Sequence, residues 1–161
     1  MENKRLYLAY GSNLSVSQMR HRCPDAHIIG TAEIKDYRLM YKGSKTGSYA
    51  TIEPEEGQKV PVLVWSISNR DEASLDRYEG YPTFYYKKEL QVEIKTLRGN
   101  ELGEHTAMVY IMDERRDHGM PSVYYEDVLR EGYKRFGFPE KVLDESLGYT
   151  AMKIYGKDAV K

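Results

Sequence analysis

The chain has 161 residues, a length that suits one domain, and its 24 lysine and arginine residues nearly balance its 25 aspartate and glutamate residues. A net charge of −1 does not favour nucleic acid or a membrane surface as a partner, so we expect a small molecule or a protein instead. No apolar run approaches the ~20 residues of a membrane-spanning helix, and no signal-peptide pattern is present. The single cysteine, Cys23, excludes an internal disulfide, and we expect a cytoplasmic protein.

Apolar and β-branched runs, separated by turn residues, predict the strands. They cover residues 5–10, 27–34, 38–41, 49–53, 60–67, 85–96 and 106–112. We expect the second and third to pair with each other, and the sixth and seventh to form a hairpin. The segment 42–48 predicts an exposed loop and 54–59 a turn, whereas 60–67 is nearly all apolar and should lie centrally in the sheet.

Helical spacing and end signals predict four helices, the second of which is capped by Asn69 or Asp71 and ends before Gly80. The first, third and fourth cover residues 15–22, 121–136 and 138–147, and the second runs through residues 75–78. The chain beyond Gly148 is a polar tail for which the sequence predicts no structure. Strands of antiparallel type with interspersed and C-terminal helices indicate one α+β domain over residues 1–148, followed by the tail 149–161.

The segment from the first strand into the first helix is the first candidate for chemistry. Gly11 allows close approach of a ligand to the backbone, Asn13 tolerates a left-handed turn, and free N–H groups follow at the start of the helix. Such a loop can bind an anion, although the same residues also suit a turn that only caps a helix.

Glu79 is the second candidate, because it lies at the predicted C-terminal end of a helix. The helix dipole and the poorly solvating neighbours Tyr78, Tyr81 and Pro82 both favour the protonated carboxyl and raise its pKa. A carboxyl with a raised pKa can take up and return a proton near neutral pH. The alternative for Glu79 is a solvated helix end.

Other chemistries find little support in the sequence. The four histidines are scattered, without the spacing of metal ligands, so we expect no metal. His21 and Cys23 point apart on a helix, and Ser12 is outside a Gly-x-Ser-x-Gly elbow, so neither a thiol nor a serine nucleophile is indicated. Fifteen tyrosines either edge the core or line a pocket with hydroxyls.

The two candidate segments occur in a fixed order with further short motifs. In chain order these are Tyr10-Gly11-Ser12-Asn13-Leu14, Ala50-Thr51-Ile52, Leu75-Asp76-x-x-Glu79-Gly80, Tyr86, Pro121-Ser122-x-x-Tyr125 and Gly132. The set resembles the γ-glutamylcyclotransferase family, AIG2-like proteins included, over nearly everything up to Leu147. One departure is Val62, at a strand position where members of the family often carry glycine.

This resemblance implies an α+β fold with a small mixed β-barrel and surrounding helices. It implies an enzyme without a cofactor, in which the α-amine of a γ-glutamyl amide attacks its own γ-carbonyl and releases 5-oxoproline and a free amine or amino acid. Glu79 would be the acid and base. The resemblance implies that the substrate is bound, and the oxyanion stabilised, by Tyr10, Gly11, Ser12, Asn13, Leu14, Tyr86 and Tyr125.

Two questions stay open at the level of sequence. A binding or sensor module could use the same pocket without turnover, and the family does not fix which γ-glutamyl amide is the substrate. The apolar residues of the predicted helices could face the strands or a second subunit, so a homodimer is one arrangement that the sequence allows.

Overall fold

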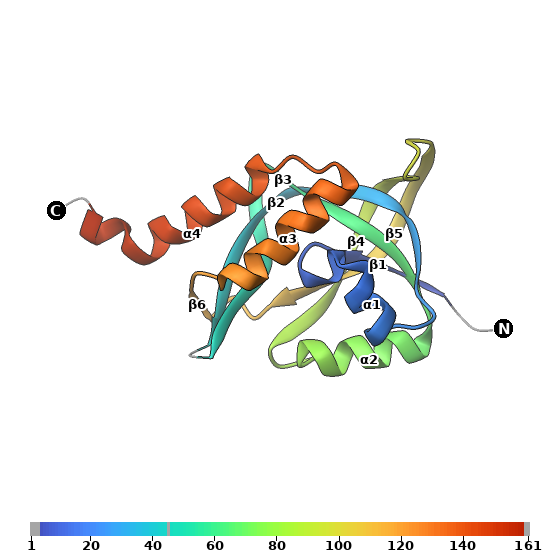
Figure 1. Ribbon diagram of the computed structural model, residues 1–161, viewed down its shortest axis with the longest axis horizontal. Coiled ribbons are helices and arrows are strands. Elements are labelled where there is room, and N and C mark those ends of the chain that lie inside the picture. The colour runs from blue at the N-terminus through green and yellow to red at the C-terminus, as the bar shows by residue number, and fades with distance from the viewer. Residues whose placement is uncertain (1–3, 45, 160–161) are drawn as a thin grey trace.

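The computed structural model describes residues 4–44 and 46–159. This part of the chain contains six strands, four α-helices and one 3₁₀ helix (Figure 1). In chain order the elements are β1 Arg5–Ala9, the 3₁₀ helix Ser12–Leu14, α1 Val16–Arg22, β2 His27–Ser44, β3 Gly47–Ile67, α2 Asn69–Glu79, β4 Tyr85–Lys95, β5 Glu101–Met112, β6 Asp117–His118, α3 Val123–Phe136 and α4 Lys141–Ala159.

The strands form one sheet that closes into a ring. Following hydrogen-bonded neighbours leads from β3 through β1, β5, β4 and β2 back to β3, and β6 extends the edge of β2. β1 and β5 are parallel, whereas the other neighbours are antiparallel, and β2 meets β4 at Thr31 and Lys95. The expected α+β class and the β4–β5 hairpin are confirmed.

The long β2–β3 hairpin differs from the prediction. β2 is one strand that pairs with β3, rather than two strands that pair with each other, because the turn expected near residue 36 is a bulge. Asp36 has a φ of 63°, and its carboxylate accepts a hydrogen bond of 3.0 Å from the Gly57 N–H across the hairpin. The bulge keeps the pairing continuous, so residues 54–59 lie within β3. Within the expected loop 42–48, residues 42–44 and 47–48 are the ends of β2 and β3, which pair at Ser44 and Gly47, and residue 45 lies outside the described residues.

The inner half of β3 lies centrally, as the sequence predicts. It pairs with β1 on one side and with β2 on the other. Val60, Val62, Leu63 and Val64 are fully buried. The core inside the ring therefore fixes the register of β1, whose C-terminal end leads into the loop of residues 10–14.

The helix ends depend on local capping. Ser68, rather than Asn69 or Asp71, is the N-cap of α2, and Asp71 completes a capping box with it. Gly80 ends α2 in the left-handed conformation, with a φ of 65°. α4 runs to Ala159 instead of ending at residue 147, and its outer part projects away from the strands (Figure 1). Within the described ranges, no helix combines the length and apolar character needed to cross a membrane.

Candidate active site

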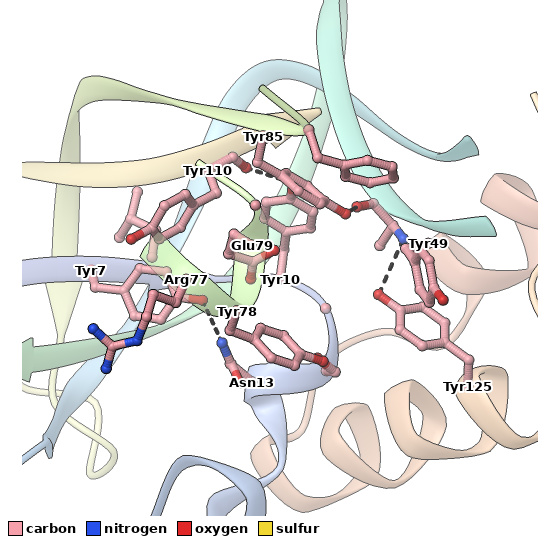
Figure 2. A pocket seen from close by; sticks show the side chains of 16 residues that line it. Tyr7, Tyr10, Asn13, Tyr49, Arg77, Tyr78, Glu79, Tyr85, Tyr110 and Tyr125 are labelled. Atoms are coloured by element: carbon pink, nitrogen blue, oxygen red, sulfur yellow. Dashed lines mark hydrogen bonds between the residues drawn. The ribbon is translucent and has the colours of Figure 1, made fainter. Parts of the chain in front are cut away.

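A pocket of about 400 Å³ opens where the end of β1, the following loop and the end of α2 meet (Figure 2). Residues of β3, β4, β5 and α3 complete its wall. Seven of the sixteen lining residues are tyrosines: Tyr7, Tyr10, Tyr49, Tyr78, Tyr85, Tyr110 and Tyr125. Seven of the tyrosines therefore do line a pocket, whose wall is largely aromatic and carries hydroxyl groups.

Glu79 is the last residue of α2 and lies among these tyrosines, near Tyr10 in Figure 2. Burial in the aromatic wall raises the pKa of its carboxyl to about 7, against an opposing effect of the Arg22 guanidinium. Among the described residues, no hydrogen bond or ion pair involves this carboxyl group. The structure thus holds a partly buried, unpartnered carboxyl that changes its charge near neutral pH.

The loop after β1 borders the same pocket and carries backbone N–H groups without a described partner. The N–H groups of Leu14 and Ser15 bond to the carbonyl oxygens of Gly11 and Ser12, each at 3.0 Å. The N–H groups of Ser12 and Asn13 precede these turns and have no partner among the described hydrogen bonds. Gly11, Ser12 and Asn13 all line the pocket, so these two N–H groups belong to the segment that borders it.

Asn13 is held by three other residues and fixes the shape of this loop. Its side-chain nitrogen donates to the Tyr7 hydroxyl at 2.9 Å, and its side-chain oxygen accepts from Arg22. Its backbone carbonyl oxygen accepts from the Trp65 indole at 3.2 Å. The Arg22 guanidinium also donates to the Ser12 hydroxyl at 3.3 Å and lies 3.4 Å from the centroid of the Tyr78 ring. Arg22 was not predicted as part of the site, because its contacts with Ser12, Asn13 and Tyr78 leave no local signal in the sequence.

Leu14 does not line the pocket. Its side chain is fully buried against α3, where a Cβ added at Gly132 would lie 2.6 Å from the Leu14 Cβ. Its N–H is used within the 3₁₀ helix. The expectation that Leu14 offers a backbone donor to the substrate is therefore not met by this geometry, and Leu14 anchors the loop to α3.

Two tyrosine hydroxyl groups hold the backbone of Ala50 at the edge of the pocket. The Tyr125 hydroxyl accepts a hydrogen bond of 3.1 Å from the Ala50 N–H, and the Tyr85 hydroxyl donates to the Ala50 carbonyl at 2.8 Å. Tyr10 donates to the carbonyl oxygen of Tyr110 at 2.6 Å. Burial raises the pKa of both Tyr10 and Tyr125, so these hydroxyls stay protonated.

Tyr86 does not line the pocket, contrary to the expectation from the family resemblance. Neighbouring residues of a strand face opposite sides of the sheet, and β4 directs Tyr85 into the pocket. The Tyr86 hydroxyl instead donates to the Glu114 carboxylate. Of the predicted site residues, the structure brings together Tyr10, Gly11, Ser12, Asn13, Glu79 and Tyr125.

Cys23 is not a nucleophile in this site. The thiol is buried, and its sulfur lies 3.6 Å from the carbonyl oxygen of Asp71. Burial and the nearby Asp71 raise the pKa of the thiol to about 12, against the opposing effect of Arg22. The titratable group of the pocket that changes its charge near neutral pH is therefore the Glu79 carboxyl and not this thiol.

Comparisons with known proteins agree with a site of this class. The family described as Gamma-glutamyl cyclotransferase, AIG2-like matches residues 7–130. The human protein named Gamma-glutamylcyclotransferase is 32% identical over 145 residues, which cover 86% of this chain and 74% of that protein. The bovine protein of the same name is 33% identical over 141 residues, covering 83% and 72%. A solved structure titled Gamma-glutamyl cyclotransferase superposes with a TM-score of 0.74 at 28% identity, covering 89% of this chain and 86% of that one.

The chain therefore belongs to the γ-glutamyl cyclotransferase, AIG2-like family, and it shares the fold of the solved structure.

Proposed function

We propose that this protein is an enzyme that cyclises a γ-glutamyl amide into 5-oxoproline and releases a free amine or amino acid. The α-amine nitrogen of the substrate forms a bond to its own γ-carbonyl carbon, and the bond from that carbon to the leaving nitrogen breaks. The α-nitrogen loses two protons as it goes from –NH3+ to the ring N–H, and the leaving nitrogen gains two as it becomes a free ammonium group; the enzyme has to carry the proton that lets the C–N bond break. The reaction needs no external nucleophile, so the protein has to orient the chain and move that proton.

Glu79 supplies the proton transfer, and its environment is the observation that carries this proposal. A carboxyl with a pKa of about 7 is partly ionised at neutral pH, so it can accept the proton of the α-ammonium group. Its protonated form can then donate to the leaving nitrogen. Its lack of any described protein partner leaves both oxygens available for these two steps.

The loop of residues 10–14 supplies orientation and charge stabilisation. The unpartnered N–H groups of Ser12 and Asn13 suit the developing oxyanion or the α-carboxylate of the substrate. Gly11 lets the substrate approach the backbone, and Tyr10 and Tyr125 also line the pocket. Leu14 acts through packing, and Tyr85 replaces Tyr86 as the tyrosine of β4 at the site.

The test is to incubate purified protein with a panel of γ-glutamyl amino acids and γ-glutamyl amines and to follow 5-oxoproline by mass spectrometry. We expect repeated turnover of at least one member and a loss of about 100-fold or more in kcat for Glu79→Gln. Glu56→Gln, on the exposed face of β3, is the matched control and should retain full activity. Binding of the panel without more than one equivalent of product would favour a sensor, and full activity of Glu79→Gln would exclude the role of Glu79.

We also propose a cytoplasmic location and a homodimer. The free, buried thiol of Cys23 suits a reducing compartment. The exposed side chains of Val123 and Tyr124, 76% and 75% accessible, suit a contact with a second subunit. Fractionation of cells and sedimentation of the purified protein test these two statements.

A further inference from the structure

Three carboxyl groups lie along one face of α2, and two of them are paired with cations. Glu72, Asp76 and Glu79 are spaced four and three residues apart, so their side chains project from the same side of the helix. Glu72 and Asp76 form ion pairs with cations of neighbouring strands. The Glu79 carboxyl has no such pair among the described residues, so its place in the pocket depends on the backbone that carries it.

Lys87 of β4 is the cation that reaches the last turn of α2. By the alternation of side chains it faces the same side of the sheet as Tyr85, which lines the pocket. Its ammonium nitrogen lies 2.6 Å from the Glu72 carboxylate and 3.0 and 3.1 Å from the two carboxylate oxygens of Asp76. Burial lowers the pKa of Lys87, but the hydrogen bonds to Glu72 and Asp76 outweigh this effect and raise the pKa, so the ammonium group stays charged.

The same ammonium group also contacts the chain that follows Glu79. Its nitrogen lies 4.3 Å from the centroid of the Tyr81 ring, a distance at which a cation is attracted to the face of an aromatic ring. The Tyr81 N–H donates to the carbonyl oxygen of Asp76 at 2.9 Å and closes the end of the helix. Lys87 therefore holds the chain at a residue before Glu79 and at a residue after it.

Asp76 connects this contact to the wall of the pocket. Tyr110 lines the pocket from β5, and its hydroxyl donates to the Asp76 carboxylate at 2.6 Å (Figure 2 labels Tyr110 and Glu79). The side chains of Lys87 and Asp76 are 16% and 28% exposed, so water screens their attraction less than that of a pair on the open surface. A displacement of Asp76 would therefore disturb the end of α2 and Tyr110 together.

We propose that Lys87 is a positioning residue that fixes the last turn of α2 and thereby the place of the Glu79 carboxyl in the pocket. This inference rests on the proposed cyclotransferase function and deepens it, because proton transfer requires the carboxyl within about 3 Å of the nitrogen that it serves. Lys87 does not line the pocket, so it acts through Glu79 and not on the substrate. Its loss should slow proton transfer while the loop of residues 10–14 still binds the substrate.

The test measures kcat and KM of Lys87→Met with the panel member that the wild-type protein turns over fastest. Methionine keeps an unbranched side chain and removes the charge. We expect kcat to fall by about 10-fold or more and KM to stay within about twofold. The assay is run at about pH 8.5, where a carboxyl with a pKa of about 7 is ionised, so that a small change in the pKa of Glu79 has little effect on kcat. Lys87→Arg should recover part of the lost kcat, because the positive charge is kept.

Arg5→Gln is the matched control on the same face of α2. Arg5 of β1 forms ion pairs with Glu72 at 2.7 Å and with Glu89 at 2.9 Å, and none of its described ion pairs involves residues 76–81. We expect a lower melting temperature for both Arg5→Gln and Lys87→Met, but a kcat within about twofold of wild type for Arg5→Gln. An equal fall of kcat in the two variants would mean that general attachment of α2 to the sheet is responsible, and it would overturn the proposal.

The other outcomes separate this inference from the function on which it rests. A wild-type kcat in Lys87→Met, or a loss confined to KM, would overturn the positioning role and leave the cyclotransferase intact. An absence of 5-oxoproline from the wild-type protein with every member of the panel would overturn both proposals. If Lys87→Met does not fold, Asp76→Asn serves instead. It keeps an acceptor for the Tyr110 hydroxyl and weakens the attraction to Lys87, so kcat should fall by about fivefold with KM unchanged, and an unchanged kcat would overturn the proposal.

Discussion

Arg22, at the end of α1, donates to the side-chain oxygen of Asn13 and thereby connects the helix to the loop that precedes it. The same guanidinium lowers the pKa of Glu79, although burial has the larger and opposite effect. The Arg22 guanidinium thus influences both the shape of the loop of residues 10–14 and the charge of the proposed catalytic carboxyl of Glu79.

Arg22→Gln should move the pH dependence of the reaction to higher pH. In wild type, kcat/KM should rise with pH and reach half its maximum near pH 7, because Glu79 must be ionised to accept a proton. Removing Arg22 removes an interaction that favours the ionised form, so the midpoint should rise. The check is the pH profile of kcat/KM, with the exposed neighbour Arg20→Gln as control. An unchanged midpoint would show that Arg22 does not act on Glu79.

Glu79→Gln should increase stability at alkaline pH more than at acidic pH. The pKa of Glu79 is raised in the folded protein, so the folded state binds more protons than the unfolded state between about pH 4.5 and 7. The contribution of Glu79 to the free energy of unfolding therefore falls as pH rises through that window. We expect a difference on the order of 1 to 2 kcal/mol between pH 5 and pH 8.5. Thermal unfolding of both proteins at the two pH values measures it.

Gly132→Ala should destabilise the protein and reduce its activity. The added methyl group would lie 2.6 Å from the Leu14 Cβ, which cannot move without moving the loop. Overpacking of this kind costs about 1 to 3 kcal/mol, more than the helix propensity gained. Gly148→Ala is a matched control, because it lies in α4 with open space around it and should be neutral or stabilising. Equal stability of the two variants would contradict the close packing of Leu14.

Gly11→Ala should reduce kcat/KM, because the added Cβ would lie 2.9 Å from the Tyr125 hydroxyl oxygen. We expect kcat/KM to fall by about 10-fold or more, because the displaced loop of residues 10–14 no longer orients the substrate. Tyr125→Phe removes that oxygen and leaves the Ala50 N–H without its acceptor, at a cost of about 1 to 3 kcal/mol in unfolding free energy. In a double-mutant cycle measured by kcat/KM, the losses of Gly11→Ala and Tyr125→Phe should not add in the double variant. Strictly additive losses would disprove the contact.

The local elements of the site could be predicted from the sequence. The strand, the glycine turn and the helix start of residues 5–22 follow from short-range signals, and so does the position of Glu79 before the left-handed Gly80. Each of these depends on residues within about one helical turn of one another. The inner half of β3 was also predictable, because burial on both faces leaves an uninterrupted apolar run.

Contacts between distant segments could not be predicted in the same way. The bulge at Asp36 depends on Gly57 across the hairpin, and the role of Arg22 depends on Asn13 and on Tyr78 of α2. The continuation of α4 past Gly148 is supported by Thr150, whose hydroxyl accepts from the Tyr41 N–H at 3.2 Å. None of these pairings leaves a periodic or local signal in the sequence.

The choice between Tyr85 and Tyr86 shows how a shift of one residue changes the expected site, and it gives a direct test. Tyr85→Phe should lower kcat/KM, because the Ala50 carbonyl at the pocket edge loses its donor, whereas Tyr86→Phe should affect only the hydrogen bond to Glu114. We expect the first variant to lose about 5- to 10-fold, the effect of about 1 kcal/mol, and the second to stay within about twofold. Steady-state kinetics with one γ-glutamyl substrate measures both. A larger loss for Tyr86→Phe than for Tyr85→Phe would support Tyr86, the tyrosine that the family resemblance assigns to the site. It would contradict the choice of Tyr85 from the alternation of side chains along β4.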